Sequence, residues 1–134
     1  MSKPDVVMIG LGYIGLPTAA LIASKKINVL GVDINENVVE TINKGKIHIV
    51  EPDLDLAVAN AVNHGFLKAS LVPKEANTYI IVVPTPFKKG NIPDISYIES
   101  ATLSITPLLK KGDLYIIEST SPIGTTEKMM NCIF

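Results

Sequence analysis

Cysteine, tryptophan and an excess of charge are what this chain lacks. Its 134 residues contain one cysteine, Cys132, and no tryptophan. A single cysteine cannot form an intrachain disulfide, so the sequence indicates a reducing compartment, and we expect a cytoplasmic protein. The net charge of −1 offers no electrostatic surface for nucleic acid or for an anionic membrane, so we expect neither as a partner.

Long apolar runs are also missing. No uninterrupted apolar segment approaches the length that a transmembrane helix needs, and we expect no secretory signal peptide. Histidine, cysteine and acidic residues do not recur at the spacing of metal ligands, so we expect no metal site. The sequence therefore predicts neither a membrane-spanning helix nor a metal site.

Apolar residues, in contrast, are abundant. They make up 47% of the chain although only 5% is aromatic, and this balance is typical of a parallel sheet covered by helices on both faces. A domain that normally meets a partner across part of its surface would show the same composition. The length is enough for one domain with a core of its own.

Three glycines near the N-terminus form the most specific motif. They follow a short β-branched run at residues 6–9 and precede a helical segment rich in small residues. Gly10 allows a tight turn, Gly12 lets the backbone approach a pyrophosphate, and Gly15 lets the helix pack close to the strand. Free N–H groups and the helix dipole favour an anion at this point. The motif therefore predicts a dinucleotide site.

A carboxylate follows the next predicted strand, residues 29–32. Asp33 can accept hydrogen bonds from both hydroxyls of a ribose and would repel a 2′-phosphate. Residues 34–37 include no arginine that would bind such a phosphate. The sequence therefore favours NAD over NADP. A structural glycine turn beside a surface aspartate is the alternative, and the complete strand–turn–helix–strand order argues against it.

Strands and helices alternate along the rest of the chain. We expect further strands at residues 66–72, 79–83 and 114–117, and helices at residues 35–44, at 53–63 and from residue 94 onward. This alternation predicts an α/β fold, a Rossmann-like doubly wound parallel sheet with helices on both faces. Right-handed crossovers give the expected strand order 3-2-1-4-5.

Local signals predict where several helices begin and end. Asp53 and Ser121 are expected to cap helices, and Pro122 to lie in the first turn of the last helix. His64 fits a helix C-terminus, where a partly positive imidazole is favourable. Pro107 should kink or end the helix that contains it.

Hydroxyl-rich loops follow two of the predicted strands. Ligands of such sheets bind beyond the carboxyl ends of the strands. Two prolines, including Pro84, hold the loop around Thr85 rigid, and residues 118–126 carry five hydroxyls at a strand end and a helix start. For Thr120, a role in the site and a structural role both stay open. Thr126 can face either the site or the solvent.

The remaining reactive side chains are weaker candidates. His48 lies in a predicted loop near Glu51, and a lone loop histidine is usually structural. Cys132 lies in an apolar helical stretch and reads as packing or as an exposed surface left by a missing partner, not as a nucleophile. The chain itself therefore offers no nucleophile that we would assign.

Five segments, in this order, resemble a known family. They are residues 10–17, 32–35, 51–52, 83–86 and 118–122, and together they resemble the N-terminal domain of the UDP-glucose/GDP-mannose dehydrogenase family. The resemblance implies oxidation of the C6 alcohol of a UDP-sugar to a carboxylate, with two NAD reduced per sugar. It also implies that a cysteine traps the aldehyde as a thiohemiacetal, which is oxidised to a thioester and hydrolysed.

Carried over residue by residue, the resemblance implies a set of cofactor contacts. Thr120 matches the family threonine that helps to position the hydrolytic water. The family's nucleophilic cysteine has no counterpart in these 134 residues. The implied cofactor contacts lie in the glycine turn, after the second strand and in the two later loops: Gly10, Gly12, Tyr13, Ile14, Gly15, Asp33, Pro84, Thr85, Ser119 and Thr126.

The resemblance also implies what the chain would lack. We expect residues 1–134 to be a truncated, incomplete NAD-binding domain without the family's central helix and its nucleotide-sugar domain, and we expect no sugar oxidation by the chain alone. The family's use of the central helix for dimerisation implies a homo-oligomer.

Other functions stay open at this stage. A regulatory nucleotide-sensing domain of an ion-transport protein would be Rossmann-like and of similar length, and it would bind NAD or ATP without chemistry. A dehydrogenase of the 6-phosphogluconate or hydroxyacid type would share the glycine turn, and so would a dehydrogenase of another UDP-sugar. The loops at residues 84–86 and 118–122 count against the first two of these.

Overall fold

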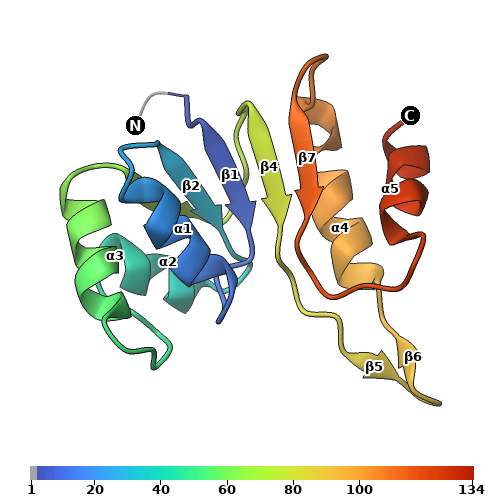
Figure 1. Cartoon of the computed structure of the whole chain (residues 1–134), viewed down its shortest axis with the longest axis horizontal. Helices are drawn as coiled ribbons and strands as arrows, with labels where there is room; N and C mark the ends of the chain where they lie inside the picture. The colour runs from blue at the N-terminus through green and yellow to red at the C-terminus, as the bar shows by residue number, and fades with distance from the viewer. Residues whose placement is uncertain (1–2) are drawn as a thin grey trace.

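A five-stranded parallel sheet organises the molecule. The computed structural model describes residues 3–134, and Figure 1 shows the sheet with helices packed against it. The order across the sheet is β3-β2-β1-β4-β7, and every neighbouring pair is parallel. The predicted strand order and the doubly wound fold are therefore confirmed. The strands are β1 (Val6–Ile9), β2 (Val29–Val32), β3 (Leu67–Ser70), β4 (Thr78–Ile81) and β7 (Leu114–Ile117).

The central strands are short and apolar because both of their faces are covered. All four residues of β2 are buried, and in β1 only Val6 is partly exposed. The register places Val7 beside Leu30 on one side and beside Tyr79 on the other. A strand that needs apolar side chains on both faces reads as a continuous apolar run instead of an alternating one.

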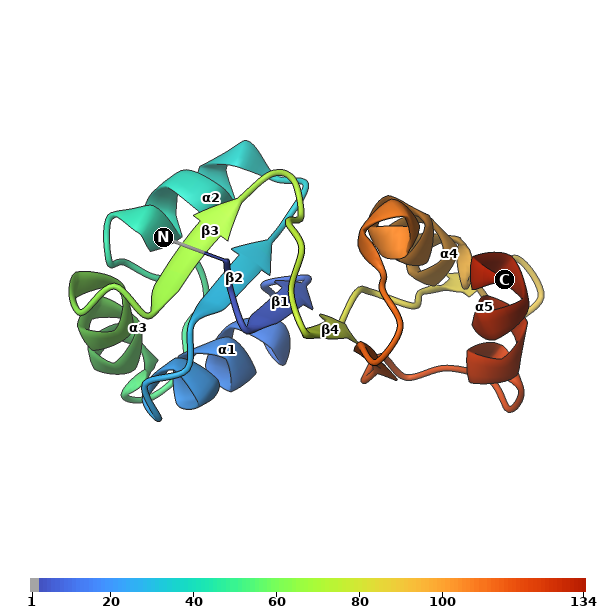
Figure 2. The ribbon, with the colours of Figure 1, turned by 90° about the horizontal axis from the view of Figure 1, so that it is seen from above.

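Two apolar cores lie on opposite faces of the sheet. Met8 and Ile80 belong to the first core, whereas Val7 and Tyr79 belong to the second, as expected for alternate strand residues. Figure 2 shows the first three helices gathered around β1–β3 and the last two beyond β4. The first group comprises α1 (Gly15–Ala23), α2 (Glu36–Asn43) and α3 (Leu54–Asn63), and the second α4 (Ser96–Ile105) and α5 (Thr125–Ile133).

Several predicted boundaries are confirmed. α4 ends at Ile105 and continues only as a 3-10 turn, η1 (Thr106–Leu108), which contains Pro107. His64 is the C-terminal cap of α3, and Gly65 follows it with a φ of 80°. The polar turn at residues 88–91 joins a two-stranded hairpin, β5 (Phe87–Lys88) and β6 (Ile92–Pro93), which the sequence pattern did not predict.

Two predicted helix signals are wrong, and a third is right only in its position. Asp53 stands at the N-cap position of α3 as predicted, but it has a left-handed φ of 61° and makes no side-chain hydrogen bond to that helix. Ser121 and Pro122 do not begin α5, which starts at Thr125 after Gly124, whose φ is 89°. A turn intervenes instead, because the Thr125 N–H donates to the Pro122 carbonyl oxygen at 3.2 Å and the Thr125 hydroxyl does so at 2.7 Å.

Candidate functional site

The glycine turn is held in place by two close backbone contacts. Gly10 has a φ of 106°, and a Cβ at this position would collide with the Val82 carbonyl oxygen. A Cβ at Gly15 would collide with the Gly10 carbonyl oxygen. Gly12 differs, since a Cβ there would meet no atom within 4 Å. Two glycines are therefore required by the fold, and Gly12 leaves open space in front of the turn.

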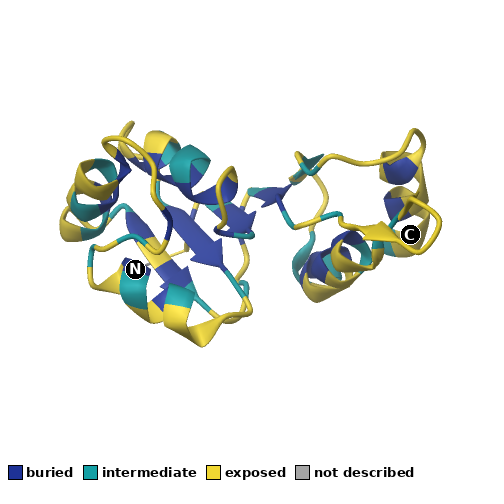
Figure 3. Ribbon diagram, turned by 90° about the horizontal axis from the view of Figure 1, so that it is seen from below, coloured by how far each residue is buried: buried dark blue, intermediate teal, exposed yellow. Residues whose placement is uncertain are grey.

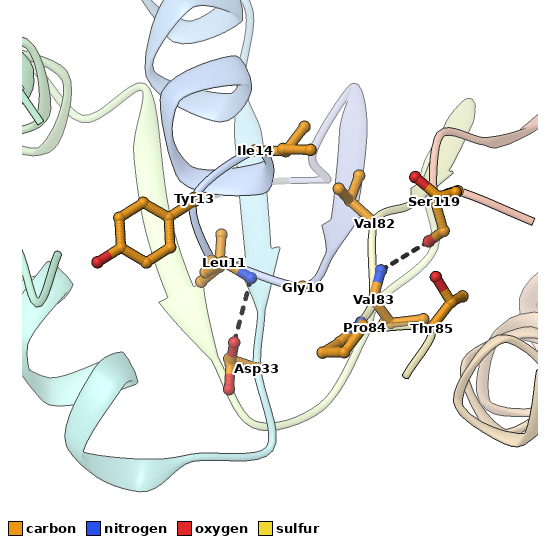
Figure 4. Close-up of a pocket in the computed structure, with 12 residues that line it drawn as sticks. Gly10, Leu11, Tyr13, Ile14, Asp33, Val82, Val83, Pro84, Thr85 and Ser119 are labelled. Atoms are coloured by element: carbon orange, nitrogen blue, oxygen red, sulfur yellow. Dashed lines mark hydrogen bonds between the residues drawn. The ribbon is translucent and has the colours of Figure 1, made fainter. Parts of the chain in front are cut away.

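Leu11 anchors the turn to the sheet. Its side chain is fully buried, and it fills the space left by Gly31 in β2, where a Cβ would lie 2.6 Å from Leu11 Cδ2. The Leu11 N–H donates to Asp33 Oδ2 at 3.1 Å (Figure 4). This arrangement was not predicted from the sequence. A glycine inside an otherwise apolar strand was the signal that could have revealed it.

The Asp33 carboxylate is hydrogen-bonded both to the glycine turn and to the residue that precedes α2. Its Oδ1 accepts the Asn35 N–H at 3.0 Å while its Oδ2 accepts the Leu11 N–H. Each carboxylate oxygen has two lone pairs, so one acceptor position per oxygen is left for a ligand. Asp33 is half-buried at the carboxyl end of β2, where a ribose would be bound in this type of fold.

A cavity of about 350 Å³ opens at the carboxyl edge of the sheet. At the start of α1 the Leu16 N–H donates to the Gly12 carbonyl oxygen at 3.0 Å, and Pro17 has no N–H, so an anion beside the glycine turn would be held by N–H groups that precede Leu16 and by the helix dipole. Figure 4 shows the turn and Asp33 on one side of this cavity and Ser119 on the other. The lining residues come from three loops and Asp33: Gly10, Leu11, Gly12, Tyr13, Ile14, Asp33, Val82, Val83, Pro84, Thr85, Ser119 and Thr120.

A second cavity of about 450 Å³ adjoins the first. The two share four lining residues, Gly10, Asp33, Val83 and Pro84, so Asp33 stands at their junction. The second cavity is largely apolar, and Tyr97 of α4 contributes an aromatic ring to its lining. This cavity was not predicted from the sequence, because Tyr97 is more than sixty positions from Asp33 in the chain.

The structure brings most of the predicted site residues together. Gly15 lies buried beneath the turn and shapes it without lining the cavity. Thr126 lies exposed in the first turn of α5 and does not line the cavity either. The predicted residues that line the first cavity are Gly10, Gly12, Tyr13, Ile14, Asp33, Pro84, Thr85, Ser119 and Thr120.

Neither a metal site nor a membrane-spanning helix is found in the part of the chain that the structure describes. Among residues 3–134, no three histidine, cysteine or acidic side chains gather as a metal site would need. None of the helices over the same residues has the length and hydropathy needed to span a bilayer. Cys132, the only cysteine, is exposed on α5.

Fold and cavity together define a dinucleotide-binding domain of the Rossmann type. A family model described as the NAD-binding domain of the UDP-glucose/GDP-mannose dehydrogenase family matches residues 4–134. The chain belongs to this family and represents its NAD-binding domain. The family resemblance predicted from the five sequence segments is confirmed, and NAD is confirmed as the cofactor of this domain.

Individual relatives agree with the family assignment. A UDP-N-acetyl-D-mannosamine dehydrogenase from Campylobacter jejuni is 63% identical over 125 residues, which are 92% of this chain and 31% of that protein. An NDP-N-acetyl-D-galactosaminuronic acid dehydrogenase from Ralstonia nicotianae is 56% identical over 122 residues, 91% of this chain and 29% of that protein. The chain thus spans about a third of the length of the curated relatives it matches.

A solved structure shows the same fold. The UDP-D-ManNAc dehydrogenase of Pyrococcus horikoshii superimposes with a TM-score of 0.91 at 43% sequence identity. The match covers 96% of this chain and 31% of the Pyrococcus chain. The fold described above is therefore that of the corresponding third of a sugar-nucleotide dehydrogenase.

Proposed function

We propose that the two adjoining cavities bind one NAD molecule along the carboxyl edge of the sheet. The observation that carries the proposal is that Gly12, with open space in front of it, and Asp33 both line the first cavity. A pyrophosphate would lie against the glycine turn and the N-terminus of α1, and Asp33 would hold the adenosine ribose. The adenine would lie in the second, apolar cavity beside Tyr97.

The other nucleotide of NAD would lie on the side of β4 and β7. Thr85 and Thr120 line the first cavity there, one from each of the two strand-end loops. The Rossmann fold binds the two halves of a dinucleotide on the two halves of its sheet, which supports this placement. When bound, the nicotinamide ring supplies a hydride acceptor. Thr85 and Thr120 would orient the ring there.

We further propose that the parent enzyme is a UDP-N-acetyl-D-mannosamine dehydrogenase of surface-polysaccharide synthesis. Such an enzyme oxidises the C6 alcohol of UDP-N-acetylmannosamine to UDP-N-acetyl-mannosaminuronate in two NAD-dependent steps. The names of the Campylobacter and Pyrococcus relatives support this substrate. Residues 47–54 and 118–122 resemble that enzyme more than other members of the family. Another UDP-sugar is the alternative, and the Ralstonia relative favours it because it is almost as similar and bears the name of a different sugar.

The chain would supply cofactor binding, not the complete active site. We propose that residues 1–134 are one portion of a longer enzyme, because the matched relatives are about three times as long. Thr120 would help to position a hydrolytic water, while the nucleophilic cysteine and the nucleotide-sugar domain would lie in other sequence.

Assembly as a homo-oligomer and action in the cytoplasm stay predictions of the sequence. Membership of this family favours a dehydrogenase over a regulatory nucleotide sensor.

The test is NADH formation by two proteins. One is the chain of 134 residues, and the other is the full reading frame that contains it in the source genome. With UDP-N-acetylmannosamine and NAD, we expect NADH from the full-length protein and none from the chain alone. NADH formed by the purified chain would show that the chain is catalytically complete. A full-length protein that oxidises UDP-N-acetylgalactosamine but not UDP-N-acetylmannosamine would overturn the proposed substrate.

A further inference from the structure

One side chain joins the end of β4 to the loop that follows β7. The Ser119 hydroxyl accepts a hydrogen bond from the Val83 N–H at 2.9 Å, as Figure 4 shows, and donates to the Ile81 carbonyl oxygen at 3.3 Å. The backbone N–H groups of Glu118 and Ser119 donate to the same carbonyl oxygen at 2.8 and 3.2 Å. The two loops are therefore connected through a cluster of bonds centred on Ser119.

The bond to Val83 extends the ladder between β4 and β7 beyond its last backbone pair. That ladder ends in register at Ile81 and Ile117. The next N–H, that of Val82, donates to the Ile9 carbonyl oxygen of β1 at 2.8 Å. Successive N–H groups of an inner strand point to opposite neighbours, so the Val83 N–H points toward β7. The Ser119 hydroxyl takes the place that a backbone carbonyl would have there.

The two residues joined by this bond stand directly before the two threonines of the cavity. Val83 is followed by Pro84 and Thr85, and Ser119 is followed by Thr120. Both threonines line the cavity of about 350 Å³. The bond between Val83 and Ser119, together with the backbone bonds to the Ile81 carbonyl oxygen, therefore helps to fix how far apart the two threonine-bearing loops are held.

The Ser119 hydroxyl oxygen is already engaged by the protein. It lies 3.3 Å from the Ile81 carbonyl oxygen, a long contact to an oxygen that also accepts two backbone N–H groups. Its strongest acceptor contact is with the Val83 N–H. Although Ser119 lines the cavity, its oxygen accepts a hydrogen bond from the protein, unlike those of Thr85 and Thr120, for which no such bond is found among the described residues.

We infer that Ser119 is a positioning residue: by accepting the Val83 N–H, it helps to hold the loops of Thr85 and Thr120 at the spacing needed for the nicotinamide half of NAD. The inference rests on the proposed NAD site. The role of Ser119 concerns only the nicotinamide half of that site, because the adenosine half is built from Asp33, the glycine turn and the second cavity. Loss of the Ser119 hydroxyl should therefore affect one half of the ligand and spare the other.

The experiment titrates NAD and ADP separately into four forms of the chain by calorimetry. The forms are the unchanged chain, Ser119→Ala, Ser119→Thr and Ser121→Ala. ADP carries the adenosine and pyrophosphate but no nicotinamide. Ser121→Ala is the matched control, since Ser121 is exposed in the same loop and does not line the cavity. Ser119→Thr keeps a hydroxyl on a β-branched side chain at the end of a strand.

We expect Ser119→Ala to lower the affinity for NAD by about five- to tenfold, the effect of about one hydrogen bond. Its affinity for ADP should stay within about twofold of the unchanged chain, because the adenosine half is untouched. Ser119→Thr should restore NAD binding, and Ser121→Ala should bind both ligands normally. Equal affinities of Ser119→Ala and the unchanged chain for NAD would overturn the inference. Equal losses for NAD and ADP would also overturn it, because they would show general structural damage.

Amide hydrogen exchange tests the hydrogen bond between Val83 and Ser119, here called the Ser119 clamp, without any ligand. In Ser119→Ala, the Val83 amide should exchange at least about tenfold faster while amides of β1 and β2 are unchanged. Unchanged exchange at Val83 would contradict the positioning role even if the chain bound no NAD. Failure of the unchanged chain to bind NAD, together with faster exchange at Val83, would overturn the proposed function and leave the clamp supported.

Discussion

The two outer edges of the sheet, formed by β3 and β7, differ in what lies beside them. Beside β3, the side-chain amide of Asn43 pairs with both backbone groups of Ala69: its Nδ2 donates to the carbonyl oxygen at 2.9 Å, and its Oδ1 accepts the N–H at 2.8 Å. Beside β7, no strand among residues 3–134 pairs with the outer edge, and the Leu114 side chain is 53% exposed. One edge is closed by a polar side chain, whereas the other is open to a further strand.

The same contrast runs through the helices. Five of the nine residues of α1 are buried, but only Thr125 and Met129 of α5 are. Figure 3 shows the strands around β1 largely buried, while the connections beyond β4 and much of the last helix are exposed. The first half of the domain therefore holds its part of the site by packing, and the second half relies more on individual hydrogen bonds such as that of Ser119.

The largest difference between the halves is expected from one substitution made in each. Leu30 in β2 is 1% exposed and packs in the second core. Leu30→Ala should lower the free energy of unfolding by about 3 kcal/mol, because it removes buried methyl groups and leaves a cavity. Leu114→Ala in β7 should lower it by less than about 1 kcal/mol. Urea denaturation measures both, and equal losses would show that β7 is as well packed as β2.

The next largest effect concerns the glycine turn. Gly10→Ala should lower the free energy of unfolding by about 2 kcal/mol or more, because the new Cβ meets the Val82 carbonyl oxygen and the φ of 106° is strained for alanine. Gly12→Ala is the matched control and should change stability by less than about 0.5 kcal/mol while lowering NAD affinity about tenfold. Similar destabilisation by both variants would mean that Gly12 is needed for folding, not for the ligand.

A smaller, pH-dependent effect is expected in the second half. Burial raises the pKa of Tyr115 above its ordinary value of 10.0, and the hydrogen bond with the Thr102 hydroxyl opposes this rise. Because the folded state disfavours the phenolate, the contribution of Tyr115 to stability is complete below pH 10.0 and is lost as the pH rises through the folded pKa. Unfolding midpoints measured on both sides of this pH should fall less in Tyr115→Phe than in the unchanged chain. An identical fall in both would contradict a burial-shifted Tyr115.

The sequence was sufficient to predict the order of the sheet and most of the residues that line the candidate site. Short apolar runs and the spacing of Gly10, Gly12 and Asp33 report local requirements that any such fold imposes. Contacts between distant residues were not predictable in this way. The packing of Leu11 on Gly31 and the bond between Ser119 and Val83 depend on how strands meet in space. The start of α5 was missed because Gly124, with its positive φ, was not read as the end of a turn.

Binding of NAD by the unchanged chain and by Asp33→Ala tests the central claim most directly. Asp5→Ala is the matched control, because Asp5 also accepts a backbone N–H, that of Asn28 at 3.1 Å, yet does not line the cavity. We expect the unchanged chain and Asp5→Ala to bind NAD alike and more tightly than NADP. Asp33→Ala should lose about tenfold in NAD affinity and most of its preference over NADP. Equal NAD binding by Asp33→Ala and the unchanged chain would contradict the placement of the ribose at Asp33.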